Sequence, residues 1–283
     1  MAAVKSINSP DNQVYKNLIK LGQKKNRDRD GLYIIEGENL IEEAIKNGIE
    51  IQSVFIREDY PEERLPEAAA AQAASEVQIF SLKRQLFNKA SDTETPQGIL
   101  AVCRKPAVSE AAFFEEAERH DGQIASDVPD QRFIVLDRLQ DPGNLGTILR
   151  TADAAGIRRI VVVKGTADLF SPKTVRAAAG SLFRVRLFFT PDGQSAIDAM
   201  KKRGIRILCT SPHAGKMYFE ENLKDRIALV IGNEANGASE TFLENSDSLI
   251  NIPMNGSIES LNAAVSAAVV MYESVRQKII QEA

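Results

Sequence analysis

Residues 133–156 read FIVLDRLQDPGNLGTILRTADAAG, and their pattern is the strongest indication of the fold class. The four apolar residues at 133–136 are typical of a buried strand. Pro142 and Gly143 mark a turn, and Asn144 can cap the helix that follows. The apolar spacing after the turn predicts a helix over 144–155. A strand, a turn and a helix in this order begin a βαβ unit, which belongs to a parallel sheet.

The same alternation continues towards the C-terminus. It predicts strands at 159–163, 184–189, 205–209, 227–231 and 248–252, and helices at 172–179, 193–203, 238–245 and 259–280. This order implies an α/β fold with a mostly parallel sheet and helices on both faces. Ligands bind to such sheets beside the carboxyl ends of the strands. The candidate ligand loops therefore follow Leu136, Cys209, Ile231 and Ile252.

A smaller α/β domain is predicted upstream. Its expected strands are 32–35, 51–56, 77–80 and 98–103, and its expected helices are 14–27, 37–47, 62–74 and 82–88. Residues 104–130 are rich in Ala, Glu and Asp, which is typical of a linker, and a helix is expected over 110–119. We therefore divide the chain into a first domain at 1–105, a linker at 106–130 and a second domain at 131–283.

The composition fits a soluble globular protein with a substantial core, since 43% of the 283 residues are hydrophobic and 26% are charged. The N-terminus has no apolar signal core, and no apolar run approaches the roughly 20 residues that span a bilayer. Cys103 and Cys209 lie in separate apolar runs, which argues against a disulfide framework and for a reducing compartment. We expect a cytoplasmic protein with no membrane partner.

Several common chemistries are excluded. The spacing of Gly232 and Gly237 is similar to that of a phosphate loop, but Ala238 and Ser239 stand where Lys and Ser/Thr are required. No GxGxxG follows a predicted strand, so a dinucleotide fingerprint is absent as well. The sequence has only two histidines, so it offers almost no residues from which to build a Ser-His-acid triad or a His/Cys zinc site.

Three polar segments remain as candidates for a site. They are NLGTILRTA at 144–152, GNEANG at 232–237 and IPMNGSIESLN at 252–262. Taken singly, the first two could be ordinary turns, and the third could cap an ordinary core or dimer helix.

Together, the three segments resemble the SpoU/TrmH family of RNA ribose methyltransferases, in the SPOUT superfamily. The first is similar to the family's Asn-x-Gly-x-x-x-Arg-Thr-Ala motif, the second to Gly-x-Glu-x-x-Gly, and the third to Ile-Pro-Met followed by Ser-Leu-Asn. Ala235 stands where many relatives carry Gly. The match spans about residues 131–280, and residues 24–37 more loosely resemble the family's substrate-binding domain.

The resemblance implies a trefoil-knotted catalytic domain, a homodimer and S-adenosylmethionine (AdoMet) as cofactor. The implied catalytic residues are Asn144, Arg150, Glu234, Ser260 and Asn262. The implied cofactor-binding residues are Thr210, Ile231, Gly232, Asn233, Ile252, Met254 and Leu261. We expect Gly232 to approach the cofactor so closely that no side chain fits, and the alanine-rich face of helix 259–280 to pack at the subunit interface.

The implied reaction is a methyl transfer from AdoMet to a ribose 2′-hydroxyl. The sulfonium is a good leaving group, so no metal is needed, and the protein must align three atoms and manage one proton. The family proposal makes Arg150 the base, although a guanidinium with a pKa above about 12 is almost always charged. We favour Arg150 as a phosphate and transition-state contact, with Glu234 or water as the proton acceptor.

The implied partner is RNA, and the first domain is expected to supply affinity for it. Lys16, Lys20, Lys24 and Arg27 are expected to lie on one helix face and to contact phosphates, although a solvated helix face gives the same pattern. An additional domain with a basic helix favours 23S ribosomal RNA as substrate. A transfer RNA methyltransferase and a non-catalytic RNA-binding assembly factor with the same fold remain the alternatives.

Overall fold

The computed structural model describes residues 4–64, 77–114, 131–224, 226–255 and 260–282. Packing divides the chain into two compact units. The N-terminal unit comprises residues 1–106 and 168–183, and the C-terminal unit comprises residues 107–167 and 184–283. This division differs from the predicted domains in two places. Residues 107–114 pack with the C-terminal unit, and residues 168–183 pack with the N-terminal unit although the sequence places them between two strands of the other sheet.

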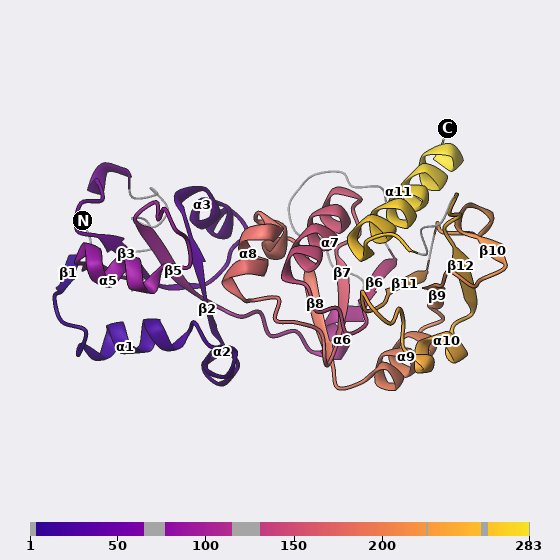
Figure 1. Cartoon of the computed structure of the whole chain (residues 1–283), viewed down its shortest axis with the longest axis horizontal. Coiled ribbons are helices and arrows are strands. Elements are labelled where there is room, and N and C mark those ends of the chain that lie inside the picture. Colours follow the sequence, from indigo (N-terminus) through magenta and orange to yellow (C-terminus); the bar gives the residue numbers. More distant parts are fainter. Residues whose placement is uncertain (1–3, 65–76, 115–130, 225, 256–259, 283) are drawn as a thin grey trace. The chain divides into compact units, whose positions relative to one another are not determined.

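The N-terminal unit contains a five-stranded sheet in the order β1-β4-β3-β5-β2 (Figure 1). Its strands are β1 (Val4–Ile7), β2 (Leu32–Glu36), β3 (Ile51–Arg57), β4 (Gln78–Leu82) and β5 (Ile99–Arg104). β1, β4 and β3 are parallel, whereas β5 is antiparallel to both of its neighbours. The sequence predicted four of these strands and missed β1, whose alternation is too short to recognise alone.

The helices of this unit enclose its sheet. They are α1 (Gln13–Lys20), α2 (Lys24–Asp30), α3 (Glu38–Lys46), η1 (Glu62–Arg64), α5 (Arg84–Ala90), α8 (Pro172–Ala178) and η3 (Ser181–Phe183). α1 and α5 bury Leu18 and Phe87 in one core with Phe55, Phe80 and Leu100 of the sheet. The predicted helix over 62–74 begins as η1, and residues 65–76 lie outside the described residues.

The prediction of one basic helix over 14–27 is wrong, because the chain forms two helices there. The amides of Leu21, Gly22 and Gln23 bond to carbonyls three residues back, at 3.1 Å each, and these tighter bonds end α1 at Lys20. α2 then begins at Lys24 with its own direction. One apolar stripe (Val14, Leu18 and Leu21) and one lysine stripe (Lys16, Lys20 and Lys24) suggested a single helix, but Gly22, a poor helix former, marks the break.

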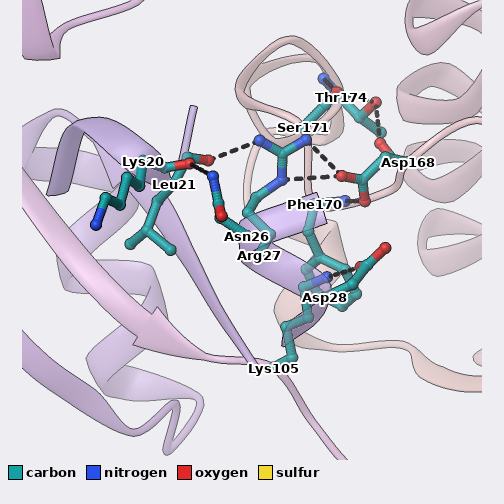
Figure 2. Close-up of polar contacts among 10 residues, drawn as sticks. All are labelled: Lys20, Leu21, Asn26, Arg27, Asp28, Lys105, Asp168, Phe170, Ser171 and Thr174. Atoms are coloured by element: carbon teal, nitrogen blue, oxygen red, sulfur yellow. Dashed lines mark hydrogen bonds and ion pairs between the residues drawn. The ribbon is translucent and has the colours of Figure 1, made fainter. Parts of the chain in front are cut away.

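Arg27 is also not part of the predicted basic face. It is only 4% exposed, and its Nε and Nη2 both donate to Asp168 Oδ2, at 2.9 and 2.6 Å (Figure 2). Its Nη1 donates to the carbonyl of Leu21 at 2.7 Å. A guanidinium that is buried and fully paired cannot reach an RNA phosphate, so Arg27 is removed from the predicted contacts.

The C-terminal unit contains a seven-stranded, entirely parallel sheet in the order β10-β12-β9-β11-β6-β7-β8. Its strands are β6 (Arg132–Leu136), β7 (Arg159–Val163), β8 (Arg186–Thr190), β9 (Arg206–Thr210), β10 (Lys216–Met217), β11 (Ile227–Ile231) and β12 (Ser248–Asn251). The predicted fold class and six of these strands are confirmed. β10 was missed because it has only two residues.

Helices cover both faces of this sheet, as predicted (Figure 1). They are α6 (Glu110–Phe114), α7 (Pro142–Ala154), α9 (Gly193–Lys201), η4 (Tyr218–Glu220), α10 (Glu240–Asn245) and α11 (Ala263–Glu282). α6, α9 and α10 pack on one face, where Phe113, Met200 and Phe242 share a core with β6 and β11. α7 and α11 pack together on the other face. Strands covered on both sides are apolar throughout, which explains the unbroken run at 133–136.

The alanine-rich face of α11 differs from its predicted role. Ala264 and Ala267 are 3% and 0% exposed, and the helix that carries them packs against α7 of the same chain. Small side chains let two helices approach closely, so the alanines serve intrachain packing.

No helix in the described part of the chain has the length and apolarity to cross a membrane.

Candidate active site

Four loops leave the same edge of the C-terminal sheet. β12, β9, β11 and β6 are consecutive neighbours and run parallel, so their carboxyl ends lie together. The strands end at Leu136, Thr210, Ile231 and Asn251, each within one residue of its predicted end. The order of strands reverses beside β6, since the chain goes from β6 to β7 on one side and returns to β11 on the other. Such a reversal opens a crevice for a ligand.

The start of α7 positions Asn144. Asp141, and not Asn144, is the N-cap, because Asp141 Oδ1 accepts from the amide of Asn144 at 2.7 Å. Pro142 occupies the first turn, where its missing N–H is not needed. The cap therefore leaves the side chain of Asn144 free for the site.

Three predicted catalytic residues form one hydrogen-bonded chain, which we call the amide relay: Asn262, Asn144 and Glu234. Asn262 Nδ2 donates to Asn144 Oδ1 at 2.9 Å, and Asn144 Nδ2 donates to Glu234 Oε1 at 3.0 Å. Asn262 Oδ1 also accepts from the amides of Ala264 and Val265, which fixes it at the start of α11. The relay thus connects the three polar segments that the sequence singled out.

The carboxylate of Glu234 also holds the loop after β6. Its Oε2 accepts from the amide of Gln140 at 3.0 Å, and its Oε1 accepts from the amide of Asp141 at 3.1 Å. Partial burial acts to raise the pKa of Glu234, but hydrogen bonds from Asn144 and from these two amides outweigh it, and the pKa lies below its ordinary value. A carboxylate that accepts three hydrogen bonds and resists protonation is a good anchor and a poor base.

The loop after β11 is closed on itself. Asn233 and Gly237 exchange two backbone hydrogen bonds of 2.9 and 2.8 Å, with Gly237 at φ +67°. Asn233 Oδ1 accepts from the amides of Ala235 and Asn236, and its Nδ2 donates to the carbonyl of Arg138. The side chain of Asn233 therefore stabilises its own loop through Oδ1 and ties it to the loop after β6 through Nδ2.

Gly232 is required by this closure. A Cβ at this position would lie 2.1 Å from the amide nitrogen of Ala238 and 2.2 Å from the carbonyl carbon of Gly237. The atoms that exclude a side chain are thus backbone atoms of the loop itself. The predicted need for glycine at position 232 therefore arises from the backbone at 237–238.

Asp137 is a residue of this site that sequence reasoning missed. It follows β6 directly and is 1% exposed. Its Oδ2 accepts from the amide of Ser239 at 2.6 Å, and its Oδ1 accepts from Arg138 Nε at 3.2 Å. The carboxylate therefore ties the loop after β6 to the end of the loop after β11. The available signal was an acidic residue that immediately follows an apolar strand, since a buried charge needs such partners.

Asp137 also influences Cys209, which lies on β9. Burial raises the pKa of Cys209 to about 12, and the negative charge of Asp137 adds to the effect. The thiol is therefore protonated at neutral pH and is not a nucleophile. Both cysteines are buried and free, as the sequence predicted.

The other predicted site residues lie on the same loops but outside the amide relay. Arg150 lies on α7, six residues beyond Asn144, and its exposed guanidinium forms no hydrogen bond or ion pair with the described residues. Ser260 is exposed just before α11. The predicted cofactor residues Thr210, Ile231, Ile252, Met254 and Leu261 stand at the ends of β9 and β11 and in the segment between β12 and α11.

Comparison with known proteins agrees with this geometry. Residues 131–272 match the SpoU rRNA Methylase family, and residues 12–101 match the MRM3-like substrate binding domain. The 23S rRNA (guanosine(2553)-2′-O)-methyltransferase RlmP of Bacillus subtilis is 35% identical over 269 residues, which cover 95% of this chain and 98% of that protein. The 23S rRNA (guanosine-2′-O-)-methyltransferase RlmB of Escherichia coli K12 is 31% identical over 80% of this chain and 90% of its own length.

A solved structure extends the likeness to the whole fold. The AdoMet-bound rRNA methyltransferase of Sinorhizobium meliloti superposes with a TM-score of 0.84 and is 27% identical, covering 97% of this chain and 98% of its own. The family that the three motifs indicated is therefore confirmed by sequence and by structure. This chain belongs to the SpoU rRNA methylase family.

Proposed function

We propose that this chain transfers a methyl group from AdoMet to a ribose 2′-hydroxyl of ribosomal RNA. The observation that carries the proposal is the amide relay, which joins all three family motifs at the carboxyl edge of the sheet. The relay holds Asn144 and Asn262, one residue from each of two family motifs, in fixed positions beside the loop of the third motif. The relatives named as 23S rRNA methyltransferases support ribosomal RNA as the substrate.

The residues present fit AdoMet. The loops after Thr210, Ile231 and Asn251 adjoin one another, and the loop at Gly232 is held in a tight backbone turn beside them. Ile252 and Met254 are partly exposed apolar side chains on the neighbouring segment, suited to the adenine ring. We propose Thr210, Ile231, Gly232, Asn233, Ile252, Met254 and Leu261 as the cofactor-binding set.

The protein's own contribution to the reaction is alignment and charge. AdoMet supplies a methyl group on a good leaving group, so the reaction needs an oriented ribose oxygen. Arg150 is the exposed cation of the motif, and we assign it to the nucleotide phosphate and to the negative charge that develops on the ribose oxygen. We place Ser260 and Asn262, which lie just before α11, beside the same ribose oxygen.

Glu234 receives a different role from the predicted one. Its three hydrogen bonds and lowered pKa make it a positioning residue for Asn144 and for the loop at 140–141. Water is then the proton acceptor, which the sequence had left as the alternative.

RNA affinity is assigned to the N-terminal unit. Lys20 and Lys24 are exposed, and Lys16 forms an exposed ion pair with Asp11 at 2.9 Å. An exposed pair of this kind contributes little and exchanges readily for a phosphate. Lys16, Lys20 and Lys24 remain proposed RNA contacts.

The test is methyl transfer from [methyl-³H]AdoMet to two RNA substrates, which are a 23S rRNA transcript and total transfer RNA. We expect label in 23S rRNA. Label in transfer RNA alone would move the proposal to the second substrate class. AdoMet binding without transfer to either RNA would favour a non-catalytic assembly factor.

Gly232→Ala should disrupt cofactor binding through the loop itself. The added methyl has no room beside the backbone at 237–238, so the loop must open. We expect AdoMet affinity to fall at least tenfold and the free energy of unfolding to fall by about 1–3 kcal/mol. Titration calorimetry and thermal unfolding measure the two effects.

The control for this variant is Gly215→Ala, on the loop after β9. A Cβ at Gly215 would meet no heavy atom within 4 Å. It should bind AdoMet as the wild type does. Wild-type affinity in Gly232→Ala would exclude this loop from the cofactor site.

A homodimer is part of the proposal, but through a different face of α11 from the predicted one. Val265, Tyr272 and Ile279 are 49%, 51% and 60% exposed and are spaced seven residues apart. Apolar side chains with this spacing form one stripe along a helix, as they do where two helices pair. A second copy of the chain would cover the stripe.

Tyr272→Glu should therefore produce a monomer, because it places a charge in the centre of this stripe. Light scattering at micromolar concentration should give the 31.1 kDa of one chain for the variant and twice that mass for the wild type. Leu243→Glu makes a similar change on α10 and should leave the dimer intact. A monomeric wild type would refute the interface.

The proposal also includes the trefoil knot of the family and a cytoplasmic location. The knot is implied by the family resemblance, and the fold shared with the solved rRNA methyltransferase of Sinorhizobium meliloti is compatible with it. The location is supported by the ribosomal substrate of the named relatives.

A further inference from the structure

A cavity in the N-terminal unit has no role in the site described above. It has a volume of about 180 Å³ and lies between α1, the end of α5 and α8. Its apolar lining includes Leu18, Ile34 and Val175. At about 30 Å³ per water molecule, the volume corresponds to about six waters, which is comparable to one heterocyclic base.

The wall that α8 provides is firmly held. The Arg27–Asp168 ion pair is almost buried, with side-chain exposures of 5% and 10%. Asp168 Oδ1 also accepts from the amide of Phe170, and its carbonyl accepts from Thr174 Oγ1 (Figure 2). The ring of Phe170 packs against that of Tyr33 with centroids 4.9 Å apart. These contacts fix the segment that leads into α8, so the cavity is preformed.

The rim of the cavity is polar and carries two cations. Lys89, at the end of α5, is exposed and forms no ion pair in the part of the chain that the structure describes. Arg176 of α8 is 35% exposed, and its Nη1 lies 2.8 Å from Asp92 Oδ2. That contact lacks hydrogen-bond geometry, so the buried Nη1 has no hydrogen-bond partner among the residues that the structure describes.

Of the two acidic residues that line the cavity, Glu36 and Asp92, the first is already satisfied. Glu36 Oε1 accepts from the hydroxyls of Ser91 and Thr93, at 2.6 and 2.7 Å. The carboxylate of Glu36 therefore stabilises the loop after α5. The groups left to meet a ligand are the ammonium of Lys89, the guanidinium of Arg176 and the half-exposed carboxylate of Asp92.

We propose that this cavity binds one unpaired base of the RNA substrate. The inference rests on the proposed function and adds a subsite to it. The aliphatic floor suits the face of a base, Asp92 can accept from an exocyclic amino group, and Lys89 and Arg176 suit the adjoining phosphate. RNA recognition outside duplexes commonly uses bases that are turned out of the stack in this way. A base within an A-form duplex cannot enter, so the subsite selects single-stranded segments.

Ala90→Phe tests the cavity. Ala90 lines it from the last residue of α5 and is partly exposed, so a larger side chain can fill the cavity from the rim. Fluorescence anisotropy with fluorescein-labelled rU12, rA12 and a 12-base-pair duplex RNA measures the effect. We expect affinity for the better-bound single strand to fall about five- to tenfold, and duplex affinity to stay unchanged.

Lys89→Glu tests the rim without altering the cavity. It should weaken single-strand binding and reduce the log–log salt slope by about 0.7 for the lost phosphate contact. Lys83→Glu is the matched control, because it makes the same charge change at the other end of α5, outside the cavity. It should leave both quantities near the wild-type values. If thermal unfolding shows that Ala90→Phe does not fold, the comparison of Lys89→Glu with Lys83→Glu still tests the subsite.

Wild-type single-strand affinity in both Ala90→Phe and Lys89→Glu would overturn the subsite. Equal losses in Lys89→Glu and Lys83→Glu would overturn it as well, since they would indicate only a general charge effect. Methyl transfer by the wild type separates this inference from the proposed function. If the wild type methylates RNA but neither Ala90→Phe nor Lys89→Glu weakens single-strand binding, the subsite is refuted and the enzymatic function stands. If the variants weaken single-strand binding but the wild type methylates no RNA, the enzymatic function is refuted and the subsite stands.

Discussion

Arg150→Ala is expected to lower kcat by about 10²–10³-fold while AdoMet affinity stays unchanged. The guanidinium is exposed and forms no hydrogen bond or ion pair with the amide relay or with the loop at 232–238, all of which the structure describes, so its loss should not disturb either. An interaction made in the transition state lowers kcat when it is removed, and it leaves ground-state binding of the cofactor intact. Single-turnover methyl transfer and titration calorimetry measure the two quantities.

Two further variants define the contribution of Arg150. Arg150→Lys should restore little activity, because a point charge does not replace a planar fork that binds phosphate. Arg158→Ala removes another exposed arginine, whose Nε lies 3.6 Å from Asp153 Oδ1, and should keep most of the activity. A rate that rises without plateau to about pH 10 in the wild type, and loses that rise in Arg150→Ala, would show instead that the guanidinium is the base.

Glu234→Ala is expected to lower kcat/KM by about 10²-fold, because it removes the acceptor for Gln140, Asp141 and Asn144 at once. Misplacement of reacting groups by about 1 Å is sufficient for a loss of this size. Glu234→Gln should fall between alanine and the wild type. It keeps the oxygen that can serve Asp141 and Asn144, but its amide nitrogen cannot accept from Gln140.

The pH dependence separates anchoring from base catalysis at Glu234. The pKa of this group lies below its ordinary value in the folded protein, so the carboxylate contacts are complete at neutral pH. They should be lost only as the pH falls through that lowered pKa, in the acidic range. A rate that rises through neutral pH in the wild type and becomes pH-independent in Glu234→Gln would identify the carboxylate as the base after all.

Much of the C-terminal unit could be predicted from the sequence. Strands that are buried on both faces consist of consecutive apolar residues, and the positions of β6, β7 and β11 were predicted from such runs alone. Because the strands are parallel, their carboxyl ends share an edge, and the loops with Asn144, Glu234 and Asn262 were correctly expected to meet there. The hydrogen bonds within the relay were not predictable, because they depend on side-chain positions from loops about 90 and 118 residues apart in the chain.

The features that the sequence did not indicate depend on long-range packing. Nothing local distinguishes Arg27 from the exposed lysines before it, and only Asp168, 141 residues further on, explains its burial. The alanines of α11 indicated close packing correctly, but they could not indicate whether the partner was another subunit or α7. Asp137 was overlooked because its partner is the backbone amide of Ser239, which has no sequence signature.

Alkaline hydrolysis of the labelled product identifies the atom that receives the methyl group. Alkali cleaves RNA through the ribose 2′-hydroxyl, so a 2′-O-methyl group protects the bond that follows it. After transfer from [methyl-³H]AdoMet to 23S rRNA and complete alkaline hydrolysis, we expect the label in alkali-stable dinucleotides and its absence from them in Arg150→Ala. Label recovered in mononucleotides would place the methyl group on a base and would contradict the account.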